Sequence, residues 1–345
     1  MDWEGLSGIK SMRFPLDRNL TTYEKNNELD KQEKINVKKN DYLTVVEIGK
    51  THMELVDRWY AQRGGVIFFA LSLMLVPLLF LLSIFPVMVL GDNPRDSIYF
   101  CLFVLILSPP IIACIYGLSL EAFKKTYYPI RLDRRNRLVH AMLPRGEIIS
   151  VKWDDLFIFI KNNHIPLMGN GWYEIRAHVL SEDKTTVLKT FTLGYPPWAS
   201  KEDALSLWEF IRGYMAKGNE YQECIEKVKL CMPIKDKREP IRFCIFRGMS
   251  WFYNAPTAQL LLSPVLAVFI WCRVIAVYTS KIPKWPIDIE EYNDNIKGEE
   301  LKNSNNNIKL KSRDWLWPQF CFYIGSVVSA VSLYFSIQYF LNSIS

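Results

Sequence analysis

Two long apolar runs separated by only six residues constrain this chain more than any other feature. Residues 66–90 and 97–120 contain no charged side chain. Each run exceeds the roughly 20 residues that an α-helix needs to cross a bilayer. Because the linker GDNPRD is so short, we expect an antiparallel transmembrane hairpin over 64–120. Pro109 and Pro110 predict a kink in its second helix.

Two further apolar segments follow, at 258–280 and 315–345. The last one is uncharged between 316 and 341 and begins among tryptophans that suit the headgroup region. The third contains Arg273, and an arginine at the bilayer centre costs ~2.5–3.5 kcal/mol on insertion scales. We favour an Arg273 that snorkels toward the following lysines, Lys281 and Lys284. The alternative is a polar contact for Arg273 inside a helix bundle.

The distribution of basic residues predicts the orientation of the hairpin. Lys and Arg flank it on both sides, whereas its tip has one Arg and two acids. Basic loops stay in the cytoplasm, so the N-terminal region 1–63 and residues 121–257 are expected there. With four spans, the polar loop 281–314 is outside and both termini are inside. If 258–280 is re-entrant instead, the loop is cytoplasmic and the C-terminus is outside.

The basic residues after the second run are unusually dense. They carry the orientation signal, and they are candidates for contact with anionic lipid headgroups at the inner leaflet. Nucleic-acid binding is not expected, because no nucleic-acid motif accompanies the charge. The candidate residues are Lys124, Lys125, Arg131, Arg134, Arg135 and Arg137.

The same stretch begins a β-rich domain over 121–218. Short strands are expected at 127–133, 137–143, 147–153, 155–161, 172–180 and 186–194. Ser200 is a good N-cap for a closing helix over 201–218. This pattern resembles a pleckstrin-homology-like barrel, so the fold class expected is an α+β membrane protein with a cytoplasmic domain of that kind.

Two regions flank this domain. Within 1–63, residues 42–49 predict a strand and residues 51–63 predict a helix that runs into the first span. The connector 219–257 is basic and amphipathic. It either lies along the membrane surface or is a solvated linker.

No catalytic constellation is evident. The sequence lacks a P-loop and the GxGxxG, HExxH and GxSxG patterns. The four histidines are scattered, and no Cys/His set has zinc-ligand spacing. Asp154 and Asp155 are expected to cap backbone amides in a turn. We therefore expect no enzyme, no metal and no cofactor.

Several ordered motifs carry a family resemblance. They are YYPIRLDRRNRLVHAML, GEIISVKWDDLFIFI, WYEIRAHVL, TFTLGYPPW and TSKIPKWP, within about 64–286. The chain is similar to a family of uncharacterised enterobacterial membrane proteins whose genes often lie in type VI secretion clusters. The resemblance implies an inner-membrane immunity protein that binds and neutralises a cognate effector toxin.

Two other functions compete with that expectation. One is a membrane-bound chaperone or adaptor that stabilises or loads a type VI effector. The other is a membrane enzyme or transporter, which would need paired charges inside the spans. The sequence offers only Arg273 there and no acid to match it.

Overall fold

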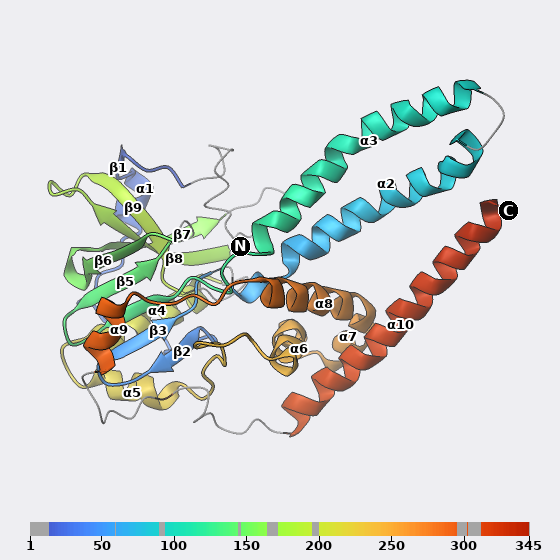
Figure 1. Cartoon of the computed structure of the whole chain (residues 1–345). Helices are drawn as coiled ribbons and strands as arrows, with labels where there is room; N and C mark the ends of the chain where they lie inside the picture. The colour runs from blue at the N-terminus through green and yellow to red at the C-terminus, as the bar shows by residue number, and fades with distance from the viewer. Residues whose placement is uncertain are drawn as a thin grey trace. The chain divides into compact units, whose positions relative to one another are not determined.

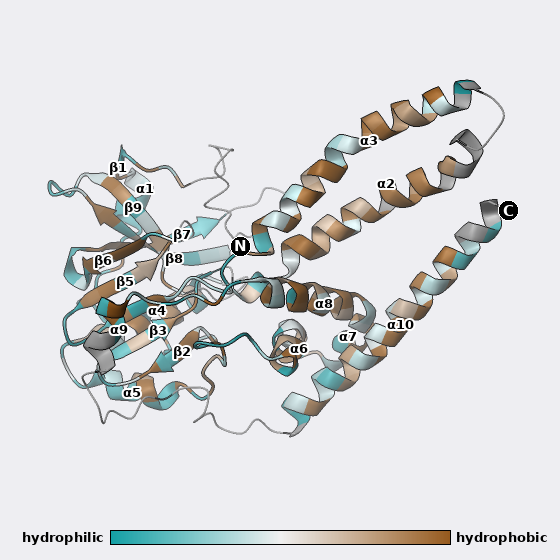
Figure 2. Ribbon diagram, in the orientation of Figure 1, coloured by the Kyte–Doolittle hydropathy of each residue, from teal (hydrophilic) through white to brown (hydrophobic). Residues whose placement is uncertain are grey.

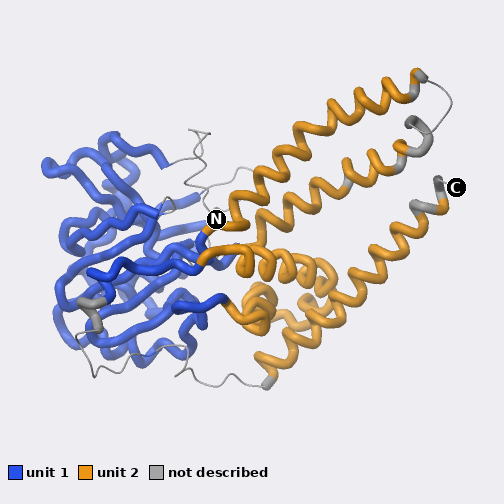
Figure 3. Tube along the Cα trace, viewed as in Figure 1, with its two compact units in different colours: residues 1–62, 125–238, 282–309 blue, residues 63–124, 239–281, 310–345 orange. Residues whose placement is uncertain are grey.

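A computed structural model describes residues 14–58, 60–89, 94–143, 146–163, 172–194, 200–294, 302 and 312–344. The chain divides into two compact units (Figure 3). Unit 1 comprises residues 1–62, 125–238 and 282–309, and unit 2 comprises residues 63–124, 239–281 and 310–345. The chain therefore leaves unit 1 and returns to it twice before it ends in unit 2.

Unit 1 contains two antiparallel sheets (Figure 1). The first has the strand order β2-β3-β4-β5-β6, and the second has the order β1-β9-β8-β7. The strands are β1 (Arg18–Asn19), β2 (Val45–Ile48), β3 (His52–Leu55), β4 (Ile130–Asp133), β5 (Leu138–Met142), β6 (Ile148–Lys152), β7 (Phe157–Asn163), β8 (Trp172–Leu180) and β9 (Thr186–Thr192).

The expected strands of 121–218 are present as β4 to β9, and β8 has the expected bounds. Consecutive strands pair with each other within β4–β6 and within β7–β9. Helix α4 (Lys201–Met215) follows them, as expected. Assignment of this architecture to the pleckstrin-homology-like class stays a prediction.

Residues 51–63 do not form the helix that we predicted. They form β3 and a short 3₁₀ helix over Tyr60–Gln62. Met53 and Leu55 alternate with polar residues and are fully buried, which is the pattern of a strand. Strand β3 pairs with β4, so the first sheet joins residues from both sides of the apolar hairpin. The β-rich domain predicted at 121–218 thus also includes residues from the N-terminal region.

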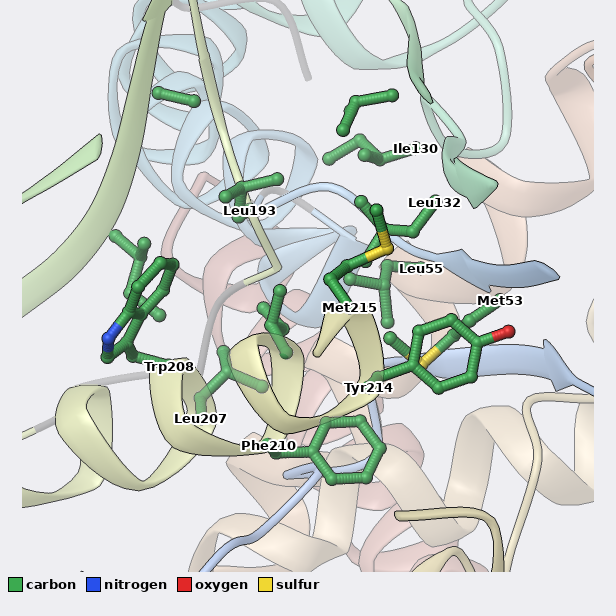
Figure 4. Close-up of a cluster of buried hydrophobic side chains, with 14 of the residues drawn as sticks. Met53, Leu55, Ile130, Leu132, Leu193, Leu207, Trp208, Phe210, Tyr214 and Met215 are labelled. Atoms are coloured by element: carbon green, nitrogen blue, oxygen red, sulfur yellow. The ribbon is translucent and has the colours of Figure 1, made fainter. Parts of the chain in front are cut away.

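Helix α4 holds the apolar core of unit 1 together (Figure 4). Its side chains Leu207, Trp208 and Tyr214 are fully buried, and the Trp208 ring stacks on Trp153 at 5.9 Å between centroids. Ser200 caps the helix: its hydroxyl accepts a hydrogen bond from the N–H of Asp203 at 3.1 Å. The other helices of unit 1 are α1 (Thr22–Asn26), α5 (Glu220–Lys227) and α9 (Ile287–Asp294), with a 3₁₀ turn at Trp153–Asp155.

Unit 2 is helical. The hairpin consists of α2 (Gly65–Val89) and α3 (Pro94–Glu121), and hydrophobic residues recur along both ribbons (Figure 2). The remaining helices are α6 (Ile241–Met249), α7 (Pro256–Leu261), α8 (Ser263–Thr279) and α10 (Ser312–Ile344), with a 3₁₀ turn at Ser250–Phe252. Among the described residues, three helices (α2, α3 and α10) are long and apolar enough to cross a membrane.

The third predicted span differs from the expectation. Residues 258–280 are divided at Leu262 into the end of α7 and the 17-residue helix α8. Pro264 stands in the first turn of α8, where it cannot donate the hydrogen bond that would continue α7. The connector 219–257 contains α5, α6 and the start of α7, so it is neither one surface helix nor a plain linker.

Candidate functional site

The predicted lipid-binding arginines are largely engaged inside unit 1. Arg131 is 2% exposed and donates to Glu54 Oε2 at 3.0 Å. Its guanidinium also lies 5.0 Å from the centre of the Trp285 ring. The same carboxylate accepts hydrogen bonds from Tyr127 and Trp285. The expectation that Arg131 contacts lipid is therefore wrong, because strand β4 turns it into the protein.

Arg134 and Arg137 hold the β4–β5 turn against the end of α4. Arg137 donates two hydrogen bonds to Asp154, at 2.8 and 2.6 Å, and a third to the Met215 carbonyl at 2.8 Å. Arg134 donates to the Gly218 carbonyl at 2.9 Å. The Asp154 carboxylate thus accepts hydrogen bonds from an arginine side chain, whereas we expected it to cap backbone amides in a turn. Its pKa is lowered by these hydrogen bonds from Arg137.

The other three predicted residues differ in exposure. Lys125 is half-buried, its ammonium lies 2.7 Å from the sulfur of Met142, and burial lowers its pKa. Lys124 and Arg135 are exposed. Of the six candidates, these two keep the access that a lipid contact needs.

The densest buried charge in unit 2 surrounds Arg273. This side chain is fully buried and forms a bidentate ion pair with Glu239, with distances of 3.0 and 2.7 Å. Its third nitrogen donates to the carbonyl of Arg63 at 3.3 Å. The favoured expectation, that Arg273 snorkels toward Lys281 and Lys284, is wrong. The alternative, a polar contact among helices, is what the structure contains.

Glu121 is the second buried acid of unit 2. Its carboxylate accepts the backbone N–H groups of Gly64 at 2.5 Å and Ile67 at 3.1 Å, so it caps the start of α2. Arg63 donates to the carbonyl of Glu121 at 3.1 Å and to the hydroxyl of Ser280. Gly64 has φ +93°, and its backbone lies so close to Arg273 that a Cβ at this position would be 2.5 Å from the backbone nitrogen of Arg273. Only glycine fits this position.

We call Arg63, Glu121, Glu239, Arg273 and Ser280 the root cluster. Four of its members lie where the chain enters or leaves unit 2: Arg63 and Glu239 are the first residues of the two excursions, and Glu121 and Ser280 precede their ends at 124 and 281. The cluster therefore fastens the ends of both excursions to one another within unit 2.

Sequence reasoning missed the two acids of the root cluster. Glu121 directly follows the second apolar run, and Glu239 directly precedes Pro240 and the apolar start of α6. An acid at the border of an apolar helix is a weak signal for a buried partner. The pairing itself depends on how the helices pack, and spacing along the chain does not give it.

A buried histidine lies on the second sheet of unit 1. His178 is fully buried, with Nε2 at 3.3 Å from Glu24 and Nδ1 at 3.0 Å from the hydroxyl of Thr190. Burial lowers the pKa of His178 to about 4. Burial would raise the pKa of Glu24, but hydrogen bonds from Arg18, Thr21 and His178 outweigh it and hold that pKa at about 2. At neutral pH a neutral imidazole therefore faces a carboxylate that Arg18 already neutralises.

The polar side chains of the first sheet are likewise paired. Glu47 and Glu54 are opposite each other in the β2–β3 register, and Arg131 lies 4.0 Å from the first and 3.0 Å from the second. His52 contacts Glu47 at 3.1 Å. These groups neutralise each other across the strands, which is how a sheet stabilises buried charge.

The described residues contain no group of three or more His, Cys, Asp or Glu side chains that could hold a metal ion. His164 lies outside the described residues. All seven cysteines are free thiols. Burial raises the pKa of Cys224 and Cys231 in unit 1 to about 12, so these two are unreactive apolar side chains at neutral pH.

Comparison with known proteins places the chain in a family. A family model described as a family of unknown function (DUF6708) matches residues 108–295. No curated protein matches the chain, and no solved structure does. The matched segment covers more than half of the chain. It runs from within α3 to the end of α9 and includes Glu121, Glu239 and Arg273.

Proposed function

Because this chain belongs to the family of unknown function DUF6708, we propose its function from its own architecture. We propose that it is a non-enzymatic binding protein of the bacterial inner membrane. In this proposal it acts as an immunity protein that binds a cognate type VI effector and protects the producing cell. The effector part of the proposal rests on the resemblance to membrane proteins encoded in type VI secretion clusters.

One observation carries the membrane part of the proposal. The long helices of unit 2 expose large apolar side chains around much of their surface, including Phe69 at 66%, Leu73 and Leu105 at 68% and Tyr339 at 80%. Contiguous apolar surface of this extent is rare on water-soluble monomers. Helices with satisfied backbones and apolar surfaces are what a bilayer accepts.

The use of the charged residues supports a binding role over catalysis. The buried carboxylates Glu24, Glu54, Glu121 and Glu239 each accept hydrogen bonds from arginine, tyrosine, tryptophan or backbone groups of the same unit. Such groups stabilise the fold. A general acid or base must instead reach a substrate proton within hydrogen-bond distance.

Chain connectivity supports three crossings of the membrane in place of four. Unit 1 is one compact body, so residues 62 and 125 lie on the same side of a membrane, as do residues 238 and 282. The first excursion contains two long helices and returns. The second contains the short helices α6 and α7 and the 17-residue helix α8, too few residues for two crossings, so an even number of crossings means that it turns back. Helix α10 then crosses once and takes the C-terminus to the opposite side.

Packing of α8 on α10 supports a re-entrant second excursion. Gly325 lies against the backbone of Ser263, and the hydroxyl of Ser329 donates to the Pro264 carbonyl at 2.8 Å. Gly325 is 12 residues after Arg313, the first residue of the apolar part of α10. Twelve residues of helix rise about 18 Å, roughly the middle of an apolar layer about 30 Å thick. The N-terminal end of α8 therefore reaches mid-membrane and no further.

This topology limits where a toxin can be bound. With unit 1 in the cytoplasm, as the flanking basic residues predict, the far side holds only the tip of the hairpin and the end of α10. The contact surface is then on unit 1 or on the lipid-facing helices. A toxin that acts in the inner membrane or the cytoplasm fits such an antagonist.

Co-expression tests the immunity proposal. The adjacent effector-like gene is induced in a sensitive host with and without this protein, and the two proteins are then purified together in detergent. Rescue of growth with a stable complex is expected. A stable complex without rescue favours the chaperone or adaptor. If neither rescue nor a stable complex is observed, the effector part of the proposal is removed.

Reporter fusions test the topology. Alkaline phosphatase, which is active only outside the cytoplasm, is fused after residue 345 and, in a second protein, after residue 306 in the polar loop. Green fluorescent protein at the same two positions gives the complementary signal. Three crossings predict phosphatase activity at 345 and fluorescence at 306. The reverse pattern at both positions would restore four crossings.

A further inference from the structure

The end of α3 has a residue that does not suit its backbone. The helix ends at Glu121, and two residues later Phe123 has φ +63°. This left-handed conformation after a helix is normally taken by glycine or asparagine. For a bulky side chain it is an outlier that costs conformational free energy.

Packing within the protein does not compensate for this conformation. Phe123 is 72% exposed, although its neighbours Ala122 and Thr126 are buried. The strained backbone therefore turns the aromatic ring outward. A feature of this kind indicates that the ring has a partner outside the chain.

Two exposed lysines lie near Phe123 along the backbone. The backbone N–H of Lys281, which follows α8, donates to the Lys124 carbonyl at 2.7 Å. The hydroxyl of Ser280 lies 3.4 Å from the carbonyl of Glu121, so the ends of α3 and α8 are side by side. Both lysine side chains are exposed, and neither has a carboxylate within salt-bridge distance in the part of the chain that the structure describes. Two exposed lysines whose backbones are hydrogen-bonded to each other, with no acid at either ammonium, favour an anionic ligand.

We propose that Phe123, Lys124 and Lys281 form a binding site for the phosphate headgroup of an anionic phospholipid. The inference rests on the membrane insertion proposed above. Both helices end here after long apolar stretches, so the corner lies at the level of the headgroups. The lysines bind the phosphate, and the Phe123 ring enters the region between headgroups and acyl chains.

A purely structural role makes different predictions. Lysines near helix C-termini also stabilise the helix dipole, and αL residues also terminate helices. In that case lipid identity has no influence, and glycine at position 123 leaves lipid binding unchanged. The lipid site instead predicts that both the charge pair and the ring contribute to affinity.

Native mass spectrometry of the full chain in a neutral detergent measures its affinity for each lipid. Phosphatidylglycerol and phosphatidylcholine are titrated separately, and we expect a preference for phosphatidylglycerol. Each of Lys124→Gln and Lys281→Gln is expected to weaken phosphatidylglycerol binding about fivefold, and the double variant about 25-fold. The matched control is Lys201→Gln with Lys229→Gln, two exposed lysines of unit 1, and it should leave the preference unchanged.

Phe123→Gly separates strain from binding. We expect it to raise the melting temperature in lipid-free detergent, because glycine suits φ +63°. We also expect it to lower the affinity for both lipids severalfold. Inorganic phosphate at millimolar concentration should not displace the lipid from the wild type, since it lacks the part that contacts the ring.

Three results would overturn the site. They are an unchanged phosphatidylglycerol preference in the lysine double variant, unchanged lipid affinity in Phe123→Gly, and displacement of the lipid by inorganic phosphate. Membrane fractionation of the wild type is measured in parallel. If the wild type is not in the membrane fraction, the proposed function itself fails. If it is, the failure concerns the lipid site alone.

Discussion

The two units place apolar and charged side chains in opposite ways. Unit 1 encloses an apolar core around Trp208 and Leu132 and pairs its buried ions across the faces of two sheets. Unit 2 exposes its large apolar side chains along α2, α3 and α10 and buries its charges among the helix ends. Figure 2 shows the contrast between the mixed colouring of the β-rich unit and the apolar long helices.

The same physical rule explains both arrangements. Apolar groups avoid water in the core of unit 1. With the membrane insertion proposed above, lipid would keep the apolar groups of unit 2 from water, and no such force would act between its helices. Charged groups are tolerated inside either unit only when they are paired. The root cluster is therefore expected to stabilise unit 2 more than any single ion pair stabilises unit 1.

The largest effect is expected from the Arg273–Glu239 pair. Arg273→Met leaves the Glu239 carboxylate buried and unpaired, and the loss of stability should be about 3–5 kcal/mol. Unfolding of the detergent-solubilised chain by sodium dodecyl sulfate, followed by circular dichroism, measures it.

The double variant Arg273→Met/Glu239→Met is the control for the unpaired charge. It should recover part of the loss, because no buried ion remains without a partner. A single variant that costs less than about 1 kcal/mol, the range of an exposed pair, would contradict a structural role for this pair.

The second effect is a pH dependence confined to unit 1. The pKa of His178 is about 4 in the folded protein and 6.5 in the unfolded chain, so the unfolded state takes up a proton first as the pH falls. Stability is complete above pH 6.5 and falls between pH 6.5 and 4, by about 3 kcal/mol at 1.36 kcal/mol per unit. Hydrogen exchange of the β8 and β9 amides as a function of pH measures this loss.

His178→Gln should flatten that dependence between pH 6.5 and 4.5. Below pH 4.5 the protonation of Glu24, whose pKa is about 2 in the folded state, adds a further loss in both proteins. A smaller slope should remain from His140, whose pKa is also lowered by burial. An unchanged slope in His178→Gln would show that His178 is not the titrating group.

The third effect compares two glycines within unit 2. A Cβ at Gly325 would lie 2.1 Å from the backbone oxygen of Ser263, whereas a Cβ at Gly117 would meet Ala70 and Val66 at an ordinary 3.7 Å. Gly325→Ala should force α8 and α10 apart at a cost of about 1–3 kcal/mol. Gly117→Ala should be neutral or slightly stabilising, because alanine favours a helix. Melting temperatures in detergent that are equal for both variants would contradict the close approach of α8 and α10.

The smallest effect concerns the cap of α4 in unit 1. Ser200→Ala removes the acceptor for the Asp203 N–H and should lower stability by about 1 kcal/mol. Ser200→Asp keeps an acceptor at this position and should retain most of the stability that Ser200→Ala loses. Urea titration followed by the fluorescence of unit 1 tryptophans compares the two. A loss with Asp as large as with Ala would show that the hydroxyl has another role.

Much of the local structure was predictable from sequence. The strands β4 to β9, helix α4 with its Ser200 cap, and the apolar runs of α2, α3 and α10 each carry a pattern of period two or 3.6, or an uncharged length, that few structures satisfy. The strand β3 was mistaken for a helix because its partner β4 lies beyond the hairpin, more than 70 residues away. A short segment takes its conformation from such a partner.

The candidate sites were less predictable. The density of basic residues after α3 predicted a lipid contact there, but of the six candidates Arg131, Arg134 and Arg137 are engaged inside unit 1 and only Lys124 and Arg135 are exposed. From sequence, Lys281 is only a lysine toward which Arg273 could snorkel. Its position beside Lys124 depends on the neighbouring ends of α3 and α8.

The sequence by itself determined which segments are long and apolar, where strands β4 to β9 lie and that Ser200 begins the closing helix. These properties depend on the order of apolar and polar residues over stretches of about ten to 30 residues. The tertiary structure alone decided that strands on both sides of the hairpin form one sheet, that the start of α8 packs against Gly325 of α10, and that Arg273 pairs with Glu239. Each of these is a contact between distant parts of the chain, set by packing and by the need to pair a buried charge.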